Sequence, residues 1–315
     1  MYSFVELLRA LAAMLITNSH FDGVYPWNIS WGGCPGVALF FLISGFVLVK
    51  SVQKENFFPW WLKKVIRLYV PLSIVNLVTV LIGYRTPSIK LFLFPININL
   101  WYVPAITILY ILYYFILRKL SGGGYRILAI VLAAVVYIVT YIVRFRNAFF
   151  VEPEVGFRLL YGFIAMMIGS LIFDHKDNEK VKSRRAMWLL LGIASCGGFL
   201  FMKLLLNRVP MLMRFQFMTQ VFGVAFAVFM MLAGLGYEQR IQVFMETRIG
   251  KVVELVSTCS LEIYLVQFAI IGYLKEIVFP VNLIVIVAII LVAAYMVHKV
   301  SQVIYVAMIN AKKWK

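Results

Sequence analysis

Residues 1–20 read MYSFVELLRALAAMLITNSH, an apolar segment with Arg9 near its middle and His20 at its end. Placing an arginine at the centre of a membrane-spanning helix costs about 2.5–3.5 kcal/mol on insertion scales, so by default such an arginine marks a functional site. On a continuous helix the two side chains would project from one face, about 16 Å apart along the axis. The segment therefore predicts a spanning helix that carries a fixed cation and a titratable imidazole on one face.

The rest of the chain is equally apolar. Of its 315 residues, 63% are hydrophobic and 14% are charged, and the mean hydropathy is +0.93. Soluble domains are about half apolar and a quarter charged, and about 20 apolar residues cross the hydrocarbon core of a bilayer. We therefore predict an all-α polytopic membrane protein with about ten transmembrane helices. The apolar windows are 2–20, 33–50, 67–84, 100–117, 127–144, 157–174, 186–204, 215–236, 258–279 and 281–304.

The net charge of +17 is explained by membrane topology rather than by nucleic-acid binding. Most of the 30 Lys and Arg residues fall on the same side of the predicted membrane as the N-terminus. This bias fits the positive-inside rule and predicts that both termini are cytoplasmic. It also favours contact with anionic membrane lipid.

The segments between the apolar windows are too short to form a soluble domain. Segment 237–257 mixes acidic, basic and apolar residues at helical spacing, which predicts a short interfacial helix. Residues 1–315 are therefore predicted to form a single membrane-embedded domain.

His20 is the best-placed candidate for proton transfer. The sequence FDGVYP at 21–26 breaks the first helix and leaves His20 beside an outward-facing loop. A neutral imidazole, with an ordinary pKa near 6.5, can take a proton from a hydroxyl near neutral pH and release it later. An interfacial histidine without chemistry is the alternative. His175 and His298 are expected to be solvated, in an inner loop and near the basic C-terminal end.

Several residues on the inner half are candidates for ligand binding. Glu6, three residues before Arg9, can pair with it on one face, which also suits a purely structural arginine. A guanidinium also suits contact with phosphate or with a carbonyl that develops negative charge, so a CoA or nucleotide ligand is the functional alternative. Ser44 and the glycines beside it permit close approach of a helix or a ligand. Lys64 and Arg67 share a helical face and can bind phosphates, although topology alone also places basic residues there.

Three pieces of sequence occur in a characteristic order and spacing: ELLR at 6–9, His20, and GVALFFLISGF at 36–46. In this arrangement the chain resembles the membrane-bound acyltransferase 3 family. Further similar stretches are KVIR at 64–67 followed by Pro71, LWY at 100–102, and STCSLEIYL at 257–265. The similarity covers essentially the whole chain.

The resemblance implies a ten-span bacterial inner-membrane protein that moves an acyl group onto hydroxyls of cell-envelope carbohydrate. The usual donor is acetyl-CoA, and no metal is expected. Carried over to this chain, the resemblance makes His20 the catalytic base or acyl relay, and Arg9, supported by Glu6, a catalytic and acyl-CoA contact. The remaining acyl-CoA-binding candidates are Ser44, Gly45, Lys64 and Arg67. Without a further domain, the membrane domain would perform the whole reaction.

The acceptor side is less sharply defined. Charged residues predicted on the outer side would hold an anionic carbohydrate acceptor, although ordinary loop charge explains them as well. These candidates are Asp22, Arg144, Arg146, Arg158, Arg208 and Arg214. The late family motif commonly ends in His, where this chain has Gln267, whose amide hydrogen-bonds but does not titrate near neutrality.

Two other functional classes compete with the enzyme. A transporter or flippase for an anionic lipid or glycan would line its path with Arg9 and His20, and would show paired broken spans that this sequence lacks. The second competing class is a membrane assembly protein that kept the acyltransferase fold but has no catalytic activity. The sequence leaves open the glycan acceptor, the acyl group and the oligomeric state, a homo-oligomer included.

Overall fold

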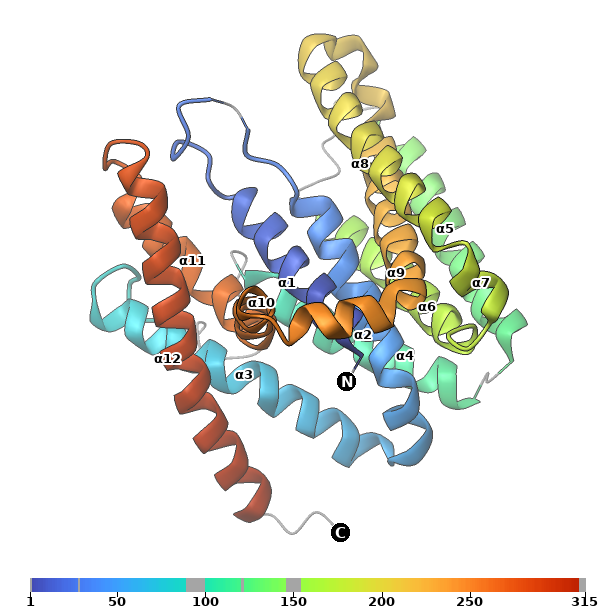
Figure 1. Ribbon diagram of the computed structural model, residues 1–315, viewed down its shortest axis with the longest axis horizontal. Coiled ribbons are helices and arrows are strands. Elements are labelled where there is room, and N and C mark those ends of the chain that lie inside the picture. The colour runs from blue at the N-terminus through green and yellow to red at the C-terminus, as the bar shows by residue number, and fades with distance from the viewer. Residues whose placement is uncertain (1, 28, 89–99, 120–121, 146–153, 312–315) are drawn as a thin grey trace.

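The computed structural model describes residues 2–27, 29–88, 100–119, 122–145 and 154–311 (Figure 1). Over these residues the chain is a bundle of helices, as predicted. The helices are α1 (Ser3–Asn18), α2 (Gly33–Lys54), α3 (Phe57–Leu81), α4 (Tyr102–Lys119), α5 (Gly123–Phe145), α6 (Val155–Asp174), α7 (Glu179–Ser183), α8 (Arg185–Arg208), the 3₁₀ helix η3 (Pro210–Phe215), α9 (Phe217–Met245), α10 (Arg248–Thr258), α11 (Ser260–Leu274) and α12 (Val281–Ala311).

Each of the ten predicted apolar windows lies largely on a helix. In the described part of the chain, eight helices are long and apolar enough to cross a bilayer, and the pair α10 and α11, bent by 76°, would make a ninth. Helix α1 is apolar as well but has only 16 residues. Helix α10 corresponds to the predicted interfacial helix, and it crosses the bundle between α9 and α11 in Figure 1. The chain is a multi-pass membrane protein.

Helix α1 lies at the centre of the bundle, with α5, α6, α8 and α9 on one side and α3, α11 and α12 on the other (Figure 1). It packs on α2, α9, α10 and α11. Its N-terminus is capped from α9, because the backbone N–H groups of Ser3 and Phe4 donate to the Glu238 carboxylate over 2.8 and 2.9 Å. At Gly36, α2 comes so close to α1 that a Cβ would lie 2.8 Å from the Ile16 side chain.

The prediction that the first helix continues to His20 is wrong. Helix α1 ends at Asn18, and the His20 N–H bonds the Thr17 carbonyl in a tighter turn. His20 therefore lies in the loop after the helix. Contrary to the prediction, it does not share a helical face with Arg9.

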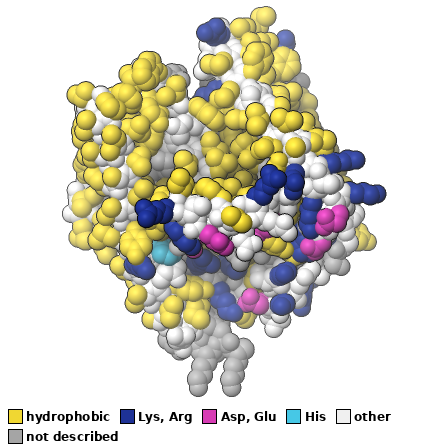
Figure 2. All heavy atoms as spheres, in the orientation of Figure 1, with side chains coloured by type: hydrophobic (Ala, Val, Ile, Leu, Met, Phe, Trp, Pro, Cys, Tyr) yellow, Lys and Arg dark blue, Asp and Glu magenta, His cyan; other side chains and the backbone are white. Residues whose placement is uncertain are grey.

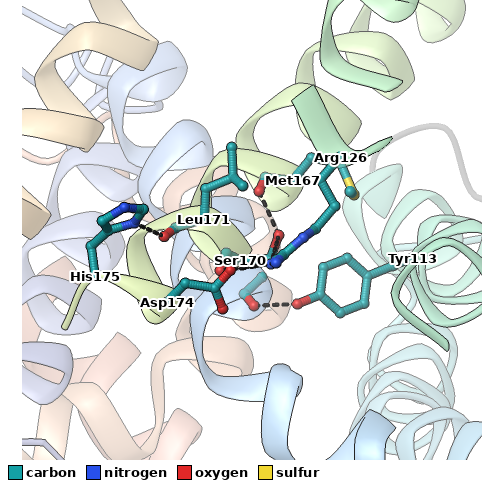
Figure 3. A network of polar contacts seen from close by, with 8 residues as sticks. Tyr113, Arg126, Met167, Ser170, Leu171, Asp174 and His175 are labelled. Atoms are coloured by element: carbon teal, nitrogen blue, oxygen red, sulfur yellow. Dashed lines mark hydrogen bonds and ion pairs between the residues drawn. The ribbon is translucent and has the colours of Figure 1, made fainter. Parts of the chain in front are cut away.

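Helices α2 and α6 meet through two glycines. A Cβ on Gly45 would collide with the Met166 backbone, and one on Gly169 would collide with the Leu42 carbonyl. Polar contacts reinforce this region (Figure 3): Arg126 of α5 pairs with Asp174 and bonds the Ser170 carbonyl, while the hydroxyl of Tyr113, from α4, donates to the Gly45 carbonyl. Gly45 thus serves helix packing.

The surface divides into an apolar region and a charged band. In the view of Figure 2, hydrophobic side chains cover the upper part, whereas Lys, Arg, Asp and Glu gather in a band across α10 and toward α7. Helix α1 begins beside this band and leads away from it (Figure 1). The arrangement agrees with an N-terminus on the basic, predicted cytoplasmic side.

The contact between α2 and α6 predicts that Gly169→Val destabilises the protein. The added side chain meets the Leu42 backbone, which cannot move aside as a flexible side chain could, so we expect a loss of about 1–3 kcal/mol or more. The measurement is the thermal unfolding midpoint of the purified protein in detergent. Gly197→Ala is the matched control, since a Cβ there meets nothing within 4 Å; equal midpoints for the two variants would contradict the packing assigned to Gly169.

Candidate functional site

A cavity of about 210 Å³ lies among α1, α2, α3, α4, α11 and α12. Three basic side chains line it: Arg9 from α1, and Lys64 and Arg67 from α3. Residues far apart in sequence thus converge, because α1 and α3 both contact α2 and α11 and both contribute side chains to the cavity. The cavity includes Lys64 and Arg67, which were predicted from the sequence to lie on the inner half.

The cavity has a surplus of positive charge. Lys64 and Arg67 make no ion pair with any acidic residue that the structure describes, and the charge of Arg67 acts on both Arg9 and Lys64. Like charges held together in a partly buried space repel, and an anion placed among them relieves that repulsion. The arrangement is therefore suited to a ligand with several negative charges, such as phosphate groups.

Ser44 faces the same cavity and belongs to a hydroxyl cluster. Its side chain lies near those of Tyr102 and Tyr110 from α4, which also line the cavity. Both tyrosines act electrostatically on Arg9. The structure therefore places Ser44 and Arg9 on the same cavity, whereas Gly45 is not among the residues that line it. Ser44 and Gly45 are neighbours that face different sides of α2.

Another wall of the cavity carries a hydrogen-bonded histidine–carboxylate pair that was not expected from the sequence. His298 of α12, expected to be solvated, places Nδ1 3.0 Å from a carboxylate oxygen of Glu262 on α11. Their side chains are only 14% and 6% exposed, and both residues line the cavity. A signal was available, because both residues fall inside predicted spans, where titratable side chains require a partner. His175, by contrast, is exposed as expected.

His20 lies beyond the cavity, on the side away from the charged band, and is not among the residues that line it. Its ring packs on Phe268 of α11 with ring centres 4.5 Å apart, and Phe268 in turn contacts Tyr264, which does line the cavity. A series of aromatic rings therefore separates the cation cluster from the imidazole. Burial and the positive charge of Arg158 lower the pKa of His20 below its ordinary value of 6.5, so it is a neutral base at physiological pH.

Gln267 lies beside this series and is fully buried. Its side-chain carbonyl accepts a hydrogen bond from the Thr17 hydroxyl over 2.8 Å, which ties α11 to the last turn of α1. The position where the family commonly has a histidine is thus occupied by an amide, one residue before the phenylalanine that contacts His20.

The outer charged candidates are dispersed. Arg158 stacks on Trp101, with the guanidinium carbon 4.6 Å from the ring centre, and acts on His20 and Tyr264. Asp22 is exposed in the loop after α1. The other arginines lie at the ends of α5, α8 and η3 or outside the described residues: Arg144, Arg208 and Arg214 are exposed, and Arg146 is not described. Of this group, we retain Arg158 as the arginine that the structure brings to the histidine.

Comparison with known proteins gives one match. A family model described as an acyltransferase domain, of the acyltransferase 3 type, matches residues 2–297. A search of curated proteins and a search of solved structures each gave no match.

The Glu262–His298 pair predicts a stability effect that depends on which partner is removed. His298→Leu leaves a buried carboxylate without its partner, so we expect a loss of about 3–5 kcal/mol. The double variant Glu262→Leu/His298→Leu should regain most of that loss, because apolar side chains tolerate burial. Thermal unfolding of both purified variants measures the difference. A double variant no more stable than His298→Leu would argue against a buried pair.

Proposed function

Because the chain belongs to the acyltransferase 3 family, we propose that this membrane acyltransferase moves an acetyl group from acetyl-CoA to a hydroxyl of a cell-envelope carbohydrate. The observation that carries the proposal is the cavity in which Arg9, Lys64 and Arg67 converge, with His20 beyond it along the same pair of helices. Acyl transfer from a cytoplasmic donor to an external acceptor needs a binding site for the charged donor on the cytoplasmic side. It also needs a base near the outer side, where the acceptor enters.

The cation cluster is proposed to hold the phosphates of acetyl-CoA. Guanidinium groups match phosphate oxygens in a bidentate manner, and a lysine adds a compact charge. Lys64 and Arg67 would contact the nucleotide end at the cavity mouth, since Arg67 is exposed, while Arg9 lies deeper on α1. Ser44, which lines the cavity with Tyr102 and Tyr110, would offer a hydroxyl to the amide groups of the pantetheine arm.

The thioester must then pass from the cavity to the imidazole. Tyr102 and Tyr264, whose ring centres are 5.8 Å apart, stand at that end of the cavity, and Phe268 continues from Tyr264 to His20. We propose that the arm enters between these rings. Close aromatic packing around the arm would exclude water, which favours transfer to a sugar hydroxyl over hydrolysis of the thioester.

His20 is proposed to act as the base. The neutral imidazole takes the proton from the acceptor hydroxyl as that oxygen attacks the thioester carbonyl carbon; the C–S bond then breaks and the imidazolium returns the proton to the leaving thiolate. A second route has the imidazole nitrogen attack first, forming an acyl-His20 that the hydroxyl then cleaves. A labelled acyl-enzyme that forms before acceptor is added would identify the second route.

The acceptor is proposed to approach from the outer face of the bacterial inner membrane. Arg158, placed near His20 by its stacking on Trp101, suits a carbohydrate that carries carboxylate or phosphate groups. Asp22, exposed in the adjacent loop, suits hydroxyls of the same sugar. We propose no metal at this site.

The first test follows labelled acetyl transfer in membranes that contain the wild type, His20→Ala, Arg9→Ala or the control His175→Ala. Labelled acetyl-CoA is supplied with envelope glycan. We expect the His20 variant to fall by about 10²–10⁴-fold, as for loss of a general base, Arg9→Ala to lose donor affinity, and the exposed His175 variant to match the wild type. Equal labelling by all four proteins would refute the assigned roles and show that Arg9 and His20 are structural.

The environment of His20 also predicts the pH dependence of activity. The base works when neutral, so activity is retained above the pKa of His20 and is lost as the pH falls through it. Because Arg158 lowers this pKa, Arg158→Gln should raise it toward 6.5 and move the acidic limb of the kcat/KM profile to higher pH. Arg144→Gln is the control and should leave that limb in place. An unchanged limb in both variants would show that His20 is not the titrating base.

A further inference from the structure

Gln267 has an amide group with one end bound and the other free. Its Oε1 accepts the hydrogen bond from Thr17, and this contact fixes the amide plane and turns the Nε2 donors away from Thr17. Nε2 is buried and has no hydrogen-bond partner within the described part of the chain. Buried donors in proteins are nearly always paired, so a free one requires an explanation.

The free donor lies where the two halves of the proposed site meet. Thr17 precedes His20 by one turn, and the His20 N–H bonds the Thr17 carbonyl. On α11, Phe268 follows Gln267 directly and contacts the His20 ring, while Tyr264 lies one turn earlier and lines the cavity. A group that passes from the cavity to His20 must therefore pass the Gln267 side of α11.

We propose that the Nε2 amide of Gln267 donates a hydrogen bond to the carbonyl oxygen of the acyl group while that group is transferred beside His20. The inference rests on the proposed function and adds a catalytic residue to it. As the attacking hydroxyl oxygen adds to the carbonyl carbon, the carbonyl electron pair moves onto oxygen. It returns when the C–S bond breaks and the thiolate leaves with the proton that His20 had taken.

An amide is well suited to this task. It donates without titrating, so its donor is present at every pH at which His20 is a neutral base. Because Thr17 already holds the other end, the donor is oriented before the acyl group arrives and needs no rearrangement during the reaction. Loss of one such donor in other enzymes lowers kcat by about 10²–10³-fold.

The test compares wild type, Gln267→Met and the matched control Gln53→Met in purified full-length protein. Methionine keeps the length of the side chain and removes both N–H groups, and Gln53 is an exposed glutamine on α2. We expect kcat of Gln267→Met to fall about 10²–10³-fold, with little change in the affinity for a CoA thioether that lacks the carbonyl. A purely structural glutamine would lower the folded fraction and leave kcat per folded molecule unaltered.

A second measurement uses the wild type alone, in case Gln267→Met does not fold. The infrared carbonyl band of bound acetyl-CoA, identified by ¹³C at the carbonyl carbon, should shift to lower frequency than that of free acetyl-CoA. An unshifted band, or a Gln267→Met enzyme with the wild-type kcat, overturns the inference while leaving acyl transfer intact. A wild type that neither binds acetyl-CoA nor transfers its acetyl group would instead refute the proposed function.

Discussion

The cap on α1 is the interaction on which the position of the candidate site depends. The first N–H groups of a helix have no partner within it, and inside an apolar bundle each one left unpaired is costly. Glu238 of α9 accepts two of them, and its negative charge also suits the positive end of the helix. Since α1 carries Arg9 into the cavity and leads directly to His20, fixing its start sets where both groups lie.

Helix α11 is the second fixed element, and it runs beside α1. The 76° bend after α10 turns it into the bundle. Along one helix it then presents Glu262 to the cavity, Gln267 to the last turn of α1, and Phe268 to His20. The pairing of Glu262 with His298 matters for this arrangement, because a carboxylate without that partner would compete with a ligand for the cations of α1 and α3. The pair leaves the positive charge of the cavity available for an anion.

The helical segments could be predicted from the sequence, since apolar windows of spanning length are a local property. The charges at the site were also visible locally, because Arg9, Lys64 and Arg67 interrupt or border such windows. What could not be predicted were partners distant in sequence, such as Glu238 for α1. One local inference failed for an identifiable reason, since α1 ends at Asn18, before the breaking residues of the loop. Gly45 was left open between a helix and a ligand, because a glycine admits either, and it packs against the Met166 backbone. A partner for His298 could have been predicted, because a histidine inside a membrane-spanning segment requires one.

The cation cluster and His20 lie apart, and this separation bears on how the proposed reaction avoids hydrolysis of the thioester. An open water-filled path from the cation cluster to His20 would let water reach the thioester beside a base. The described helices instead place Tyr102, Tyr264 and Phe268 between the two, with Gln267 buried next to them. These side chains must move apart for the pantetheine arm of acetyl-CoA and then pack around it. Binding of the phosphates, far from His20, would provide the free energy for this movement. Remote binding energy used in this way raises the rate of the chemical step rather than the affinity alone. A donor fragment that lacks the nucleotide should therefore react slowly even at saturating concentration.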